Sequence, residues 1–219
     1  KTLGFPVDID EENAVVKVTG TGGQIPEKQA SVYVGSAGTA ARFLTAMLAL
    51  SGGTYEVTSS DQMKRRPMRP LLEALELLGT RFEYMEEPYA FPFRILGREI
   101  KGYQEIPLNI DASSQFLSAL LLAGVMQKEG FRIHLTGTRD ARSYVNISMK
   151  MMDAFGCRMQ MCGKDDYEIL PDSSYRARTY QIEPDVSAAC YFYAMAAVNG
   201  GSARVKYVHK DSTQGDIRF

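Results

Sequence analysis

The chain has 219 residues, of which 45% are hydrophobic and 23% charged, and its formal net charge is −1. This composition is typical of a soluble globular protein of one or two domains, and it excludes a disordered chain and a strongly basic nucleic-acid-binding surface. No stretch approaches the roughly 20 apolar residues of a membrane span, and no signal peptide opens the chain. Three cysteines are too few for a disulfide framework. We therefore expect a reduced, cytoplasmic protein that binds neither membrane nor nucleic acid.

In chain order, the first clear element is a helix over residues 39–53, "TAARFLTAMLALSGG", and similar segments recur at 113–127 and 187–201. Each has small residues, then an aromatic residue, then apolar residues on nearly every face. The aromatic residues are spaced by 73 and 76 positions, at Phe43, Phe116 and Phe192. A helix that is apolar on all sides must be buried on all sides, so the sequence predicts three interior helices.

A segment of alternating polarity follows each of these helices, which predicts a strand at "TYEVTSS", "FRIHLTG" and "ARVKYVHK". The first two strands lead into amphipathic helices at residues 66–79 and 144–156, and each helix ends at a glycine, the residue that ends helices at least cost. Short strands come next, at "RFEYMEE", "FPFRILG" and "IPLNI" in the first copy. The repeating unit is therefore helix, strand, helix and two or three strands.

The helix-ending glycines Gly4, Gly79 and Gly156 are spaced by 75 and 77 residues. In this frame, Leu3 and Gly4 end an amphipathic helix, and "STQGDIRF" stands where the third copy's amphipathic helix begins. We therefore expect a fragment that is truncated at both ends. Units of this length exceed those of common solenoids and favour a few large α/β repeats around a pseudo-symmetry axis.

Polar residues cluster just before each interior helix: Ser36 and Thr39, Ser113 and Ser114, and Ser187. Each is consistent with an ordinary helix cap. Helix starts that point the same way also combine their free N–H groups and positive dipole ends, which favours an anionic ligand. Gln115 adds a side-chain amide at this point. Gly38 in "GSAGTA" leaves room for a ligand near the backbone, although the stretch lacks the spacing of a nucleotide P-loop.

The stretch "QMKRRPMRP" carries four cations, Lys64, Arg65, Arg66 and Arg69. Such a run is typical either of a solvated face or of a phosphate or carboxylate site. Arg66 precedes Pro67, which suits the first turn of a helix and would hold the guanidinium for bidentate contacts. The next copy has Arg142 and Tyr144 at the corresponding place, so cations and hydroxyls recur at equivalent positions.

Other constellations are unfavourable. Cys157 and Cys162 are separated by four residues, but His134 and His209 lie in strand patterns far from them, so we expect no zinc site. The same two histidines argue against a Ser-His-Asp triad, and Cys190 is expected in the core. The carboxylates Asp111, Glu183 and Asp185 are candidate acids or bases, and they are equally consistent with helix or turn caps.

Six segments together resemble the 3-phosphoshikimate 1-carboxyvinyltransferase (EPSP synthase) family, in order and spacing: "SAGTAARFL", "QMKRRPMRPLLEAL", "DASSQFLSALLLA", "RSYVNISMKMMDAFG", "EPDVSAACYF" and "STQGDIRF". The resemblance covers essentially the whole chain. It implies an α/β fold of repeated βαβαββ units, with buried helices inside and sheets outside, in an enzyme of six repeats and two domains. Residues 1–182 would form most of the first domain, which binds shikimate 3-phosphate, and residues 183–219 the beginning of the second.

The resemblance implies transfer of an enolpyruvyl group from phosphoenolpyruvate to the 5-hydroxyl of shikimate 3-phosphate, without metal or cofactor. It places Thr39, Ser113, Ser114, Gln115, Arg142 and Tyr144 at shikimate 3-phosphate, and Ser36, Gly38, Arg66 and Gln115 at phosphoenolpyruvate, with Lys64 a weaker candidate. The family's acid–base residues are expected beyond Phe219. The fragment alone would then be inactive, and the remainder of the parent enzyme would be its partner.

Four positions depart from the family pattern. Ser36 stands where many members have Asn, Gln62 where Arg is common, and Phe43 where Pro is usual, which leaves sensitivity to the inhibitor glyphosate open. Ala141 replaces a phosphate-binding Ser at a cost of about 1–3 kcal/mol if nothing else bonds the phosphate, and Arg142 is the candidate to do so. Two alternatives stay open, a UDP-N-acetylglucosamine enolpyruvyl transferase and a non-catalytic scaffold that uses "KRRPMR" on an anionic partner.

Overall fold

The computed structural model describes residues 1–138 and 142–218, and the side chains within these ranges except those of residues 142 and 143. Two four-stranded sheets have the same topology: a parallel pair of strands, then two further strands joined antiparallel. The first sheet has the order β3-β4-β6-β5 and contains β3 (Gln29–Tyr33), β4 (Thr54–Thr58), β5 (Thr80–Tyr84) and β6 (Phe93–Arg98). The second has the order β7-β8-β10-β9 and contains β7 (Gln104–Leu108), β8 (Phe131–Leu135), β9 (Met159–Met161) and β10 (Asp166–Ile169).

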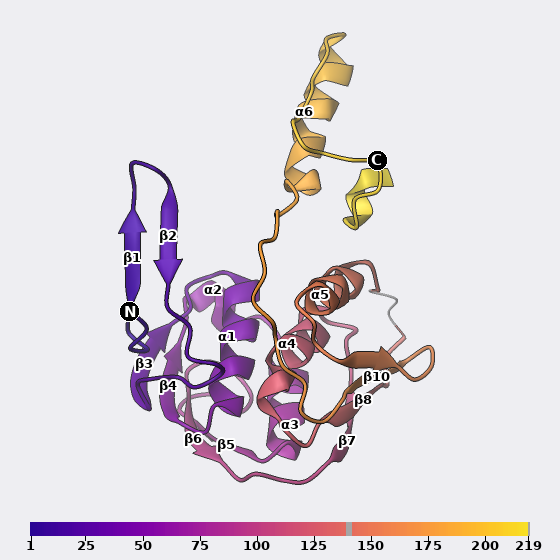
Figure 1. Ribbon diagram of the computed structural model, residues 1–219. Coiled ribbons are helices and arrows are strands. Elements are labelled where there is room, and N and C mark those ends of the chain that lie inside the picture. The colour runs from indigo at the N-terminus through magenta and orange to yellow at the C-terminus, as the bar shows by residue number, and fades with distance from the viewer. Residues whose placement is uncertain (139–141, 219) are drawn as a thin grey trace.

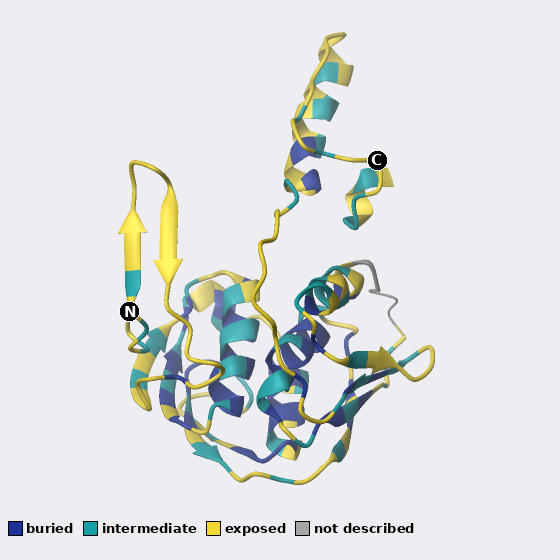
Figure 2. Cartoon of the chain, viewed as in Figure 1, coloured by how far each residue is buried: buried dark blue, intermediate teal, exposed yellow. Residues whose placement is uncertain are grey.

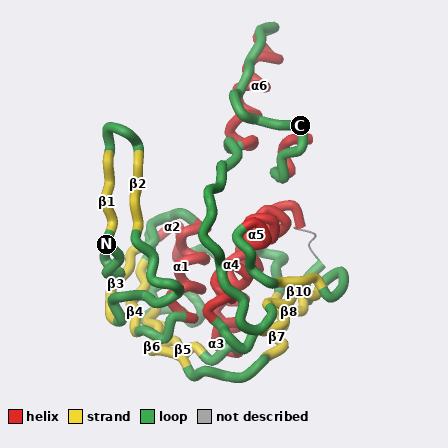
Figure 3. The backbone as a smooth tube through the Cα atoms, in the orientation of Figure 1, coloured by secondary structure: helices red, strands yellow, loops and turns green. Residues whose placement is uncertain are grey.

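Helices accompany each sheet, and apart from one short extra helix in the first unit the chain contains two consecutive βαβαββ units, as the family resemblance implied. The units begin at Gln29 and Gln104, and their helices lie on the inner side of the sheets (Figures 1 and 3). The helices of the first unit are α1 (Gly38–Leu50), the short α2 (Asp61–Lys64) and α3 (Arg69–Leu77). Those of the second are α4 (Gln115–Ala123), which continues into the 3₁₀ turn η1 (Gly124–Met126), and α5 (Arg142–Ala154).

Helices α1 and α4 pack against each other in the centre of the domain and are largely buried, which confirms two of the three predicted interior helices (Figure 2). Amphipathic α3 presents one apolar face to the same core, where Leu71, Leu72 and Leu75 are buried. The helix stops at Gly79, whose φ of +99° is a left-handed conformation that favours glycine. An added Cβ there would lie 2.1 Å from the carbonyl oxygen of Glu99, so the turn requires glycine for space as well.

The third predicted copy differs from the first two. Helix α6 (Val186–Asn199) forms, but it stands apart from the sheets, and the side chains of Phe192 and Val198 are 56% and 86% exposed (Figure 2). The predicted strand at 203–210 is wrong, because those residues form neither helix nor strand. An apolar helix and a strand both need neighbours, and in the described residues α6 contacts mainly the short turn η2 (Gly215–Arg218).

Smaller expectations also changed. Leu3 and Gly4 form a turn, in which the φ of Gly4 is +81°. This turn leads into an exposed hairpin of β1 (Val7–Asp10) and β2 (Val15–Val18), which projects from the domain (Figure 1). His209 lies outside any strand. Pro67 is not in the first turn of a helix: α3 begins at Arg69, and Pro70 occupies the first turn instead.

Candidate anion-binding site

The starts of α1 and α4 lie side by side, although Thr39 in the first turn of α1 and Gln115 at the start of α4 are 76 residues apart in the chain. The side-chain amide of Gln115, the first residue of α4, donates from Nε2 to Oγ1 of Thr39 at 3.0 Å. Neither helix has a side-chain cap at its N-cap residue, Ala37 or Ser114. The backbone N–H of Gln115 bonds instead to Oγ of Ser113 at 3.2 Å. The two buried helix starts therefore direct mainly the positive ends of their dipoles at the same region.

A pocket of about 380 Å³ opens at this junction. Its walls come from α1, the loop before α3, the start of α4, and α5. The lining residues are Thr39, Phe43, Arg66, Ala112, Ser113, Ser114, Gln115, Ser118, Tyr144, Ile147 and Ser148. The pocket thus brings together most of the residues that the sequence singled out, in a volume that suits a small phosphorylated metabolite.

Gly38 lies directly behind the guanidinium of Arg66. A Cβ added to Gly38 would stand 2.6 Å from Nη1 and 2.7 Å from Nη2 of Arg66, so only glycine leaves the guanidinium in this place. Arg66 makes no ion pair with a carboxylate in the part of the chain that the structure describes. Its charge is therefore available to an anion in the pocket.

Other predicted residues do not line the pocket. Ser36 is exposed and its Oγ is paired with Oγ of Ser60 at 2.8 Å. Lys64 is held by Glu86 at 2.9 Å, on the surface. Ala141 lies outside the described residues, and although Arg142 begins α5, its side chain is not described.

The basic run is also less uniform than its sequence indicated. Lys64 is paired as above, and Arg69 pairs with Glu73 at 3.5 Å and lies over the ring of Tyr89 at 4.2 Å. Two of the four cations are thus engaged within the domain, and Arg66 turns toward the pocket. This arrangement disfavours a continuous basic surface for an acidic partner.

Arg42 is the functional candidate that the sequence reasoning missed. It lies on α1 next to the pocket with only 2% of its surface exposed, and its guanidinium contacts the ring of Phe116 at 4.9 Å. From Nη1 it donates to Oε1 of Gln115 at 2.6 Å and to Oγ of Ser113 at 3.2 Å, and from Nη2 to the carbonyl of Pro67 at 3.0 Å. A lone arginine inside "TAARFLTAML" was the signal that could have found it.

The electrostatics of Arg42 are unusual because no carboxylate within the described residues neutralises it. Burial, and secondly the nearby charge of Arg66, lower the pKa of Arg42 to about 10. The side chain stays charged at neutral pH. Arg66 lines the pocket and Arg42 lies beside it, and neither guanidinium has a carboxylate partner among the described residues. This arrangement favours a ligand of negative charge.

A second pocket of about 440 Å³ adjoins the first, and Tyr144 lines both. It separates α5 from the start of α6 and carries the carboxylates of Glu183, Asp185 and Asp216. Asp185 caps α6 by accepting from the N–H of Ala188 at 3.0 Å. Glu183 accepts from the hydroxyl of Ser212, so these two candidate acids have structural partners.

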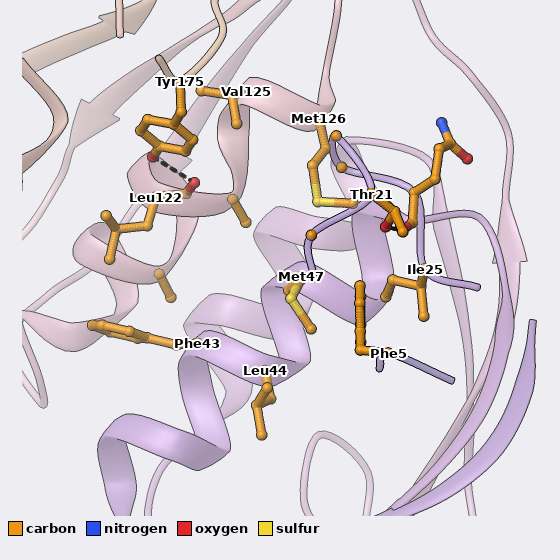
Figure 4. A pocket seen from close by; sticks show the side chains of 16 residues that line it. Phe5, Thr21, Ile25, Phe43, Leu44, Met47, Leu122, Val125, Met126 and Tyr175 are labelled. Carbon is orange, nitrogen blue, oxygen red and sulfur yellow. Dashed lines mark hydrogen bonds between the residues drawn. The ribbon is translucent and has the colours of Figure 1, made fainter. Parts of the chain in front are cut away.

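A third pocket, of about 420 Å³, lies on another side of α1 and α4 (Figure 4). Its walls are mostly apolar, from Phe43, Leu44, Met47 and Leu122 to the loop around Thr21, and none of its lining residues is charged. The hydroxyl of Tyr175 at its edge donates to the carbonyl of Leu122 at 2.8 Å. This pocket lacks the groups that would hold an anion.

Two βαβαββ units that bring their helix starts to one pocket define the chain as an α/β domain of the repeated type, with its helices inside and its sheets outside. The EPSP synthase (3-phosphoshikimate 1-carboxyvinyltransferase) family model matches residues 1–219, so the chain belongs to that family. No helix in the described ranges is both long and apolar enough to cross a membrane.

Relatives and solved structures agree with this assignment. The 3-phosphoshikimate 1-carboxyvinyltransferase of Trichormus variabilis is 39% identical over 215 residues, which are 98% of this chain and 50% of that protein. The enzyme of the same name from Neisseria meningitidis serogroup B is 35% identical over 99% of this chain and 50% of its own length. The EPSP synthase structure from Acinetobacter baumannii superposes with a TM-score of 0.71 at 25% identity, covering 90% of this chain and 43% of that one. The chain spans about half the length of the curated relatives it matches.

Proposed function

We propose that the chain forms the shikimate-3-phosphate-binding part of an enzyme that transfers the enolpyruvyl group of phosphoenolpyruvate to the 5-hydroxyl of that acceptor. One observation carries the proposal: Thr39, Ser113, Ser114, Gln115 and Tyr144, from two repeats and three helices, line one pocket with Arg66. Hydroxyls and amides suit the sugar-like ring, and guanidinium and helix N–H groups suit phosphate. Family membership supports the same chemistry.

Within the pocket, the two substrates would occupy different sides. The serines at the start of α4, the amide of Gln115 and the hydroxyl of Tyr144 would hold shikimate 3-phosphate, together with Thr39 and Arg142. Arg66, with Gly38 behind it, would bind the phosphate or carboxylate of phosphoenolpyruvate beside Gln115. These donors would hold the reacting carbon near the 5-hydroxyl, which lowers the barrier by orientation. Ser36 would contribute only if its pairing with Ser60 opened.

Residues 1–182 would belong to the acceptor-binding domain, and residues 183–219 would begin a second one. The support is that residues 173–185 form neither helix nor strand and lead to α6, which stands apart from the two sheets. The proton transfers of the reaction would need acid–base residues from the remaining half of a full-length enzyme, so we expect the 219-residue chain alone to bind its acceptor without turnover.

Calorimetry and thermal shift with the 219-residue chain test the proposal. Shikimate 3-phosphate should raise the melting temperature, and Ser114→Ala should weaken its binding, whereas the matched control Ser202→Ala on the exposed loop after α6 should not. A response to UDP-N-acetylglucosamine in place of shikimate 3-phosphate would assign the chain to the other enolpyruvyl transferase. Binding of an acidic peptide without either metabolite would favour the scaffold alternative.

A further inference from the structure

Arg42 stands out because it is buried and charged, yet it does not line the pocket. Its guanidinium contacts two residues that do, Ser113 and Gln115, and no carboxylate pairs with it within the described ranges. Its Nε is buried without a hydrogen-bond partner in the same part of the chain. A group that costs stability in this way calls for a compensating role.

The first consequence concerns the amide of Gln115. A guanidinium has donors only, so the amide must turn its oxygen toward Arg42, and Oε1 lies 2.6 Å from Nη1. The nitrogen is thereby directed away from Arg42 and toward the pocket, where one N–H bonds to Oγ1 of Thr39 at 3.0 Å. Arg42 thus decides which end of this amide a ligand meets.

The second consequence concerns the hydroxyl of Ser113. Its oxygen accepts from Nη1 of Arg42 at 3.2 Å and from the backbone N–H of Gln115, also at 3.2 Å. A hydroxyl oxygen has two lone pairs, and both are used in this way. The remaining O–H can only donate, so Ser113 also offers a hydrogen rather than a lone pair to the pocket.

We propose that Arg42 is a positioning residue that fixes the hydrogen-bond polarity of the anion pocket, because it makes both Gln115 and Ser113 donors toward the ligand. The carbonyl of Pro67, which accepts from Nη2 at 3.0 Å, ties the same guanidinium to the loop that carries Arg66. One buried side chain of α1 therefore connects three walls of the pocket: α1 itself, the start of α4 and the loop that carries Arg66. The inference rests on the proposed function only for its choice of shikimate 3-phosphate as the probe.

The sharpest test is a change of sign in a double-mutant cycle on the 219-residue chain. Gln115→Glu should raise the melting temperature while Arg42 is present, because the new carboxylate pairs with the buried guanidinium. In an Arg42→Met background the same Gln115→Glu change should lower the melting temperature, because it buries an unpaired carboxylate. Equal shifts of the same sign in both backgrounds would overturn the proposal.

A second readout follows the ligand. Arg42→Met should weaken the binding of shikimate 3-phosphate by about tenfold or more, since two oriented donors lose their fixed direction. It should also shift the side-chain N–H signals of Gln115 in a nitrogen-correlated NMR spectrum without any ligand. Arg98→Met is the matched control, because Arg98 is another partly buried guanidinium that bonds to the carbonyls of Leu50 and Leu78, away from the pocket.

The outcomes separate the two claims. A wild-type chain that does not bind shikimate 3-phosphate, together with the sign change in melting temperature, would refute the proposed function and support the role of Arg42. An Arg42→Met chain with unchanged affinity for shikimate 3-phosphate and unchanged Gln115 signals would overturn the role of Arg42 and leave the proposed function standing.

Discussion

Replacing Gly38 by alanine separates binding from stability at this site. The new Cβ would stand 2.6–2.8 Å from three atoms of the Arg66 guanidinium. Ordinary carbon contacts need about 3.5 Å or more, so the guanidinium must move by about 1 Å. A misplacement of that size costs on the order of 100-fold in rate, or about 2.7 kcal/mol. We expect Gly38→Ala to lower kcat/KM for phosphoenolpyruvate by that order.

Stability should hardly respond, since the clash is with the far end of a flexible side chain and alanine favours the start of α1. We expect the free energy of unfolding to change by less than about 1 kcal/mol. The kinetic assay uses a polypeptide that carries this chain and has the length of its relatives. Gly102→Ala is the control, since its Cβ would meet nothing within 4 Å. A Gly38→Ala enzyme with kcat/KM within twofold of the parent would refute the reasoning.

Three further predictions concern charge and burial. Arg66→Ala should lower kcat/KM for phosphoenolpyruvate at least tenfold, about 1.4 kcal/mol, and an unchanged value would remove Arg66 from the site. Cys157 is buried, and burial raises its pKa to about 11, whereas Cys162 is exposed, although its hydrogen bond to Glu168 also raises its pKa. Because of this difference in exposure, iodoacetamide at pH 8 should modify Cys162 first, and equal rates in peptide mapping would contradict this. The hydrogen bond with His134 lowers the pKa of Asp166 in the folded protein below its ordinary 3.8. The ionised carboxylate therefore stabilises the fold above pH 3.8, and this contribution is lost as the pH falls through the pKa of the folded state. The stability gap between the wild type and Asp166→Asn, measured by denaturant titration, should therefore narrow below pH 3.8, and a constant gap would refute the assignment.

The sequence predicted the elements whose partners lie within the chain. Alternation in β4 and β8, the apolar face of α3 and the glycines after α3 and α5 all reflect local geometry, and all were confirmed. The predictions that α6 is buried and that residues 203–210 form a strand failed for one reason. Both segments have the pattern of buried elements, but the described residues supply no surface to bury them. The periodicity of a segment indicates which face must be buried, but it does not show whether a neighbouring element is present to bury that face.

The site was predictable in part for a similar reason. Repetition of hydroxyls before two helices indicated that Thr39 and Ser113 would meet, and the pocket brings them together. Arg42 was missed because a charged residue in an apolar helix has no pattern of its own, and its partner 73 positions away is known only from the fold. The pairings of Ser36 and Lys64 were hidden from the sequence in the same way.

The pocket takes its walls from both βαβαββ units, Thr39 and Arg66 from the first and Gln115 and Tyr144 from the second. One βαβαββ unit alone supplies only part of these walls, so a ligand in the pocket would contact both units at once. A change that weakens the packing between α1 and α4 should therefore abolish ligand binding before it unfolds either βαβαββ unit.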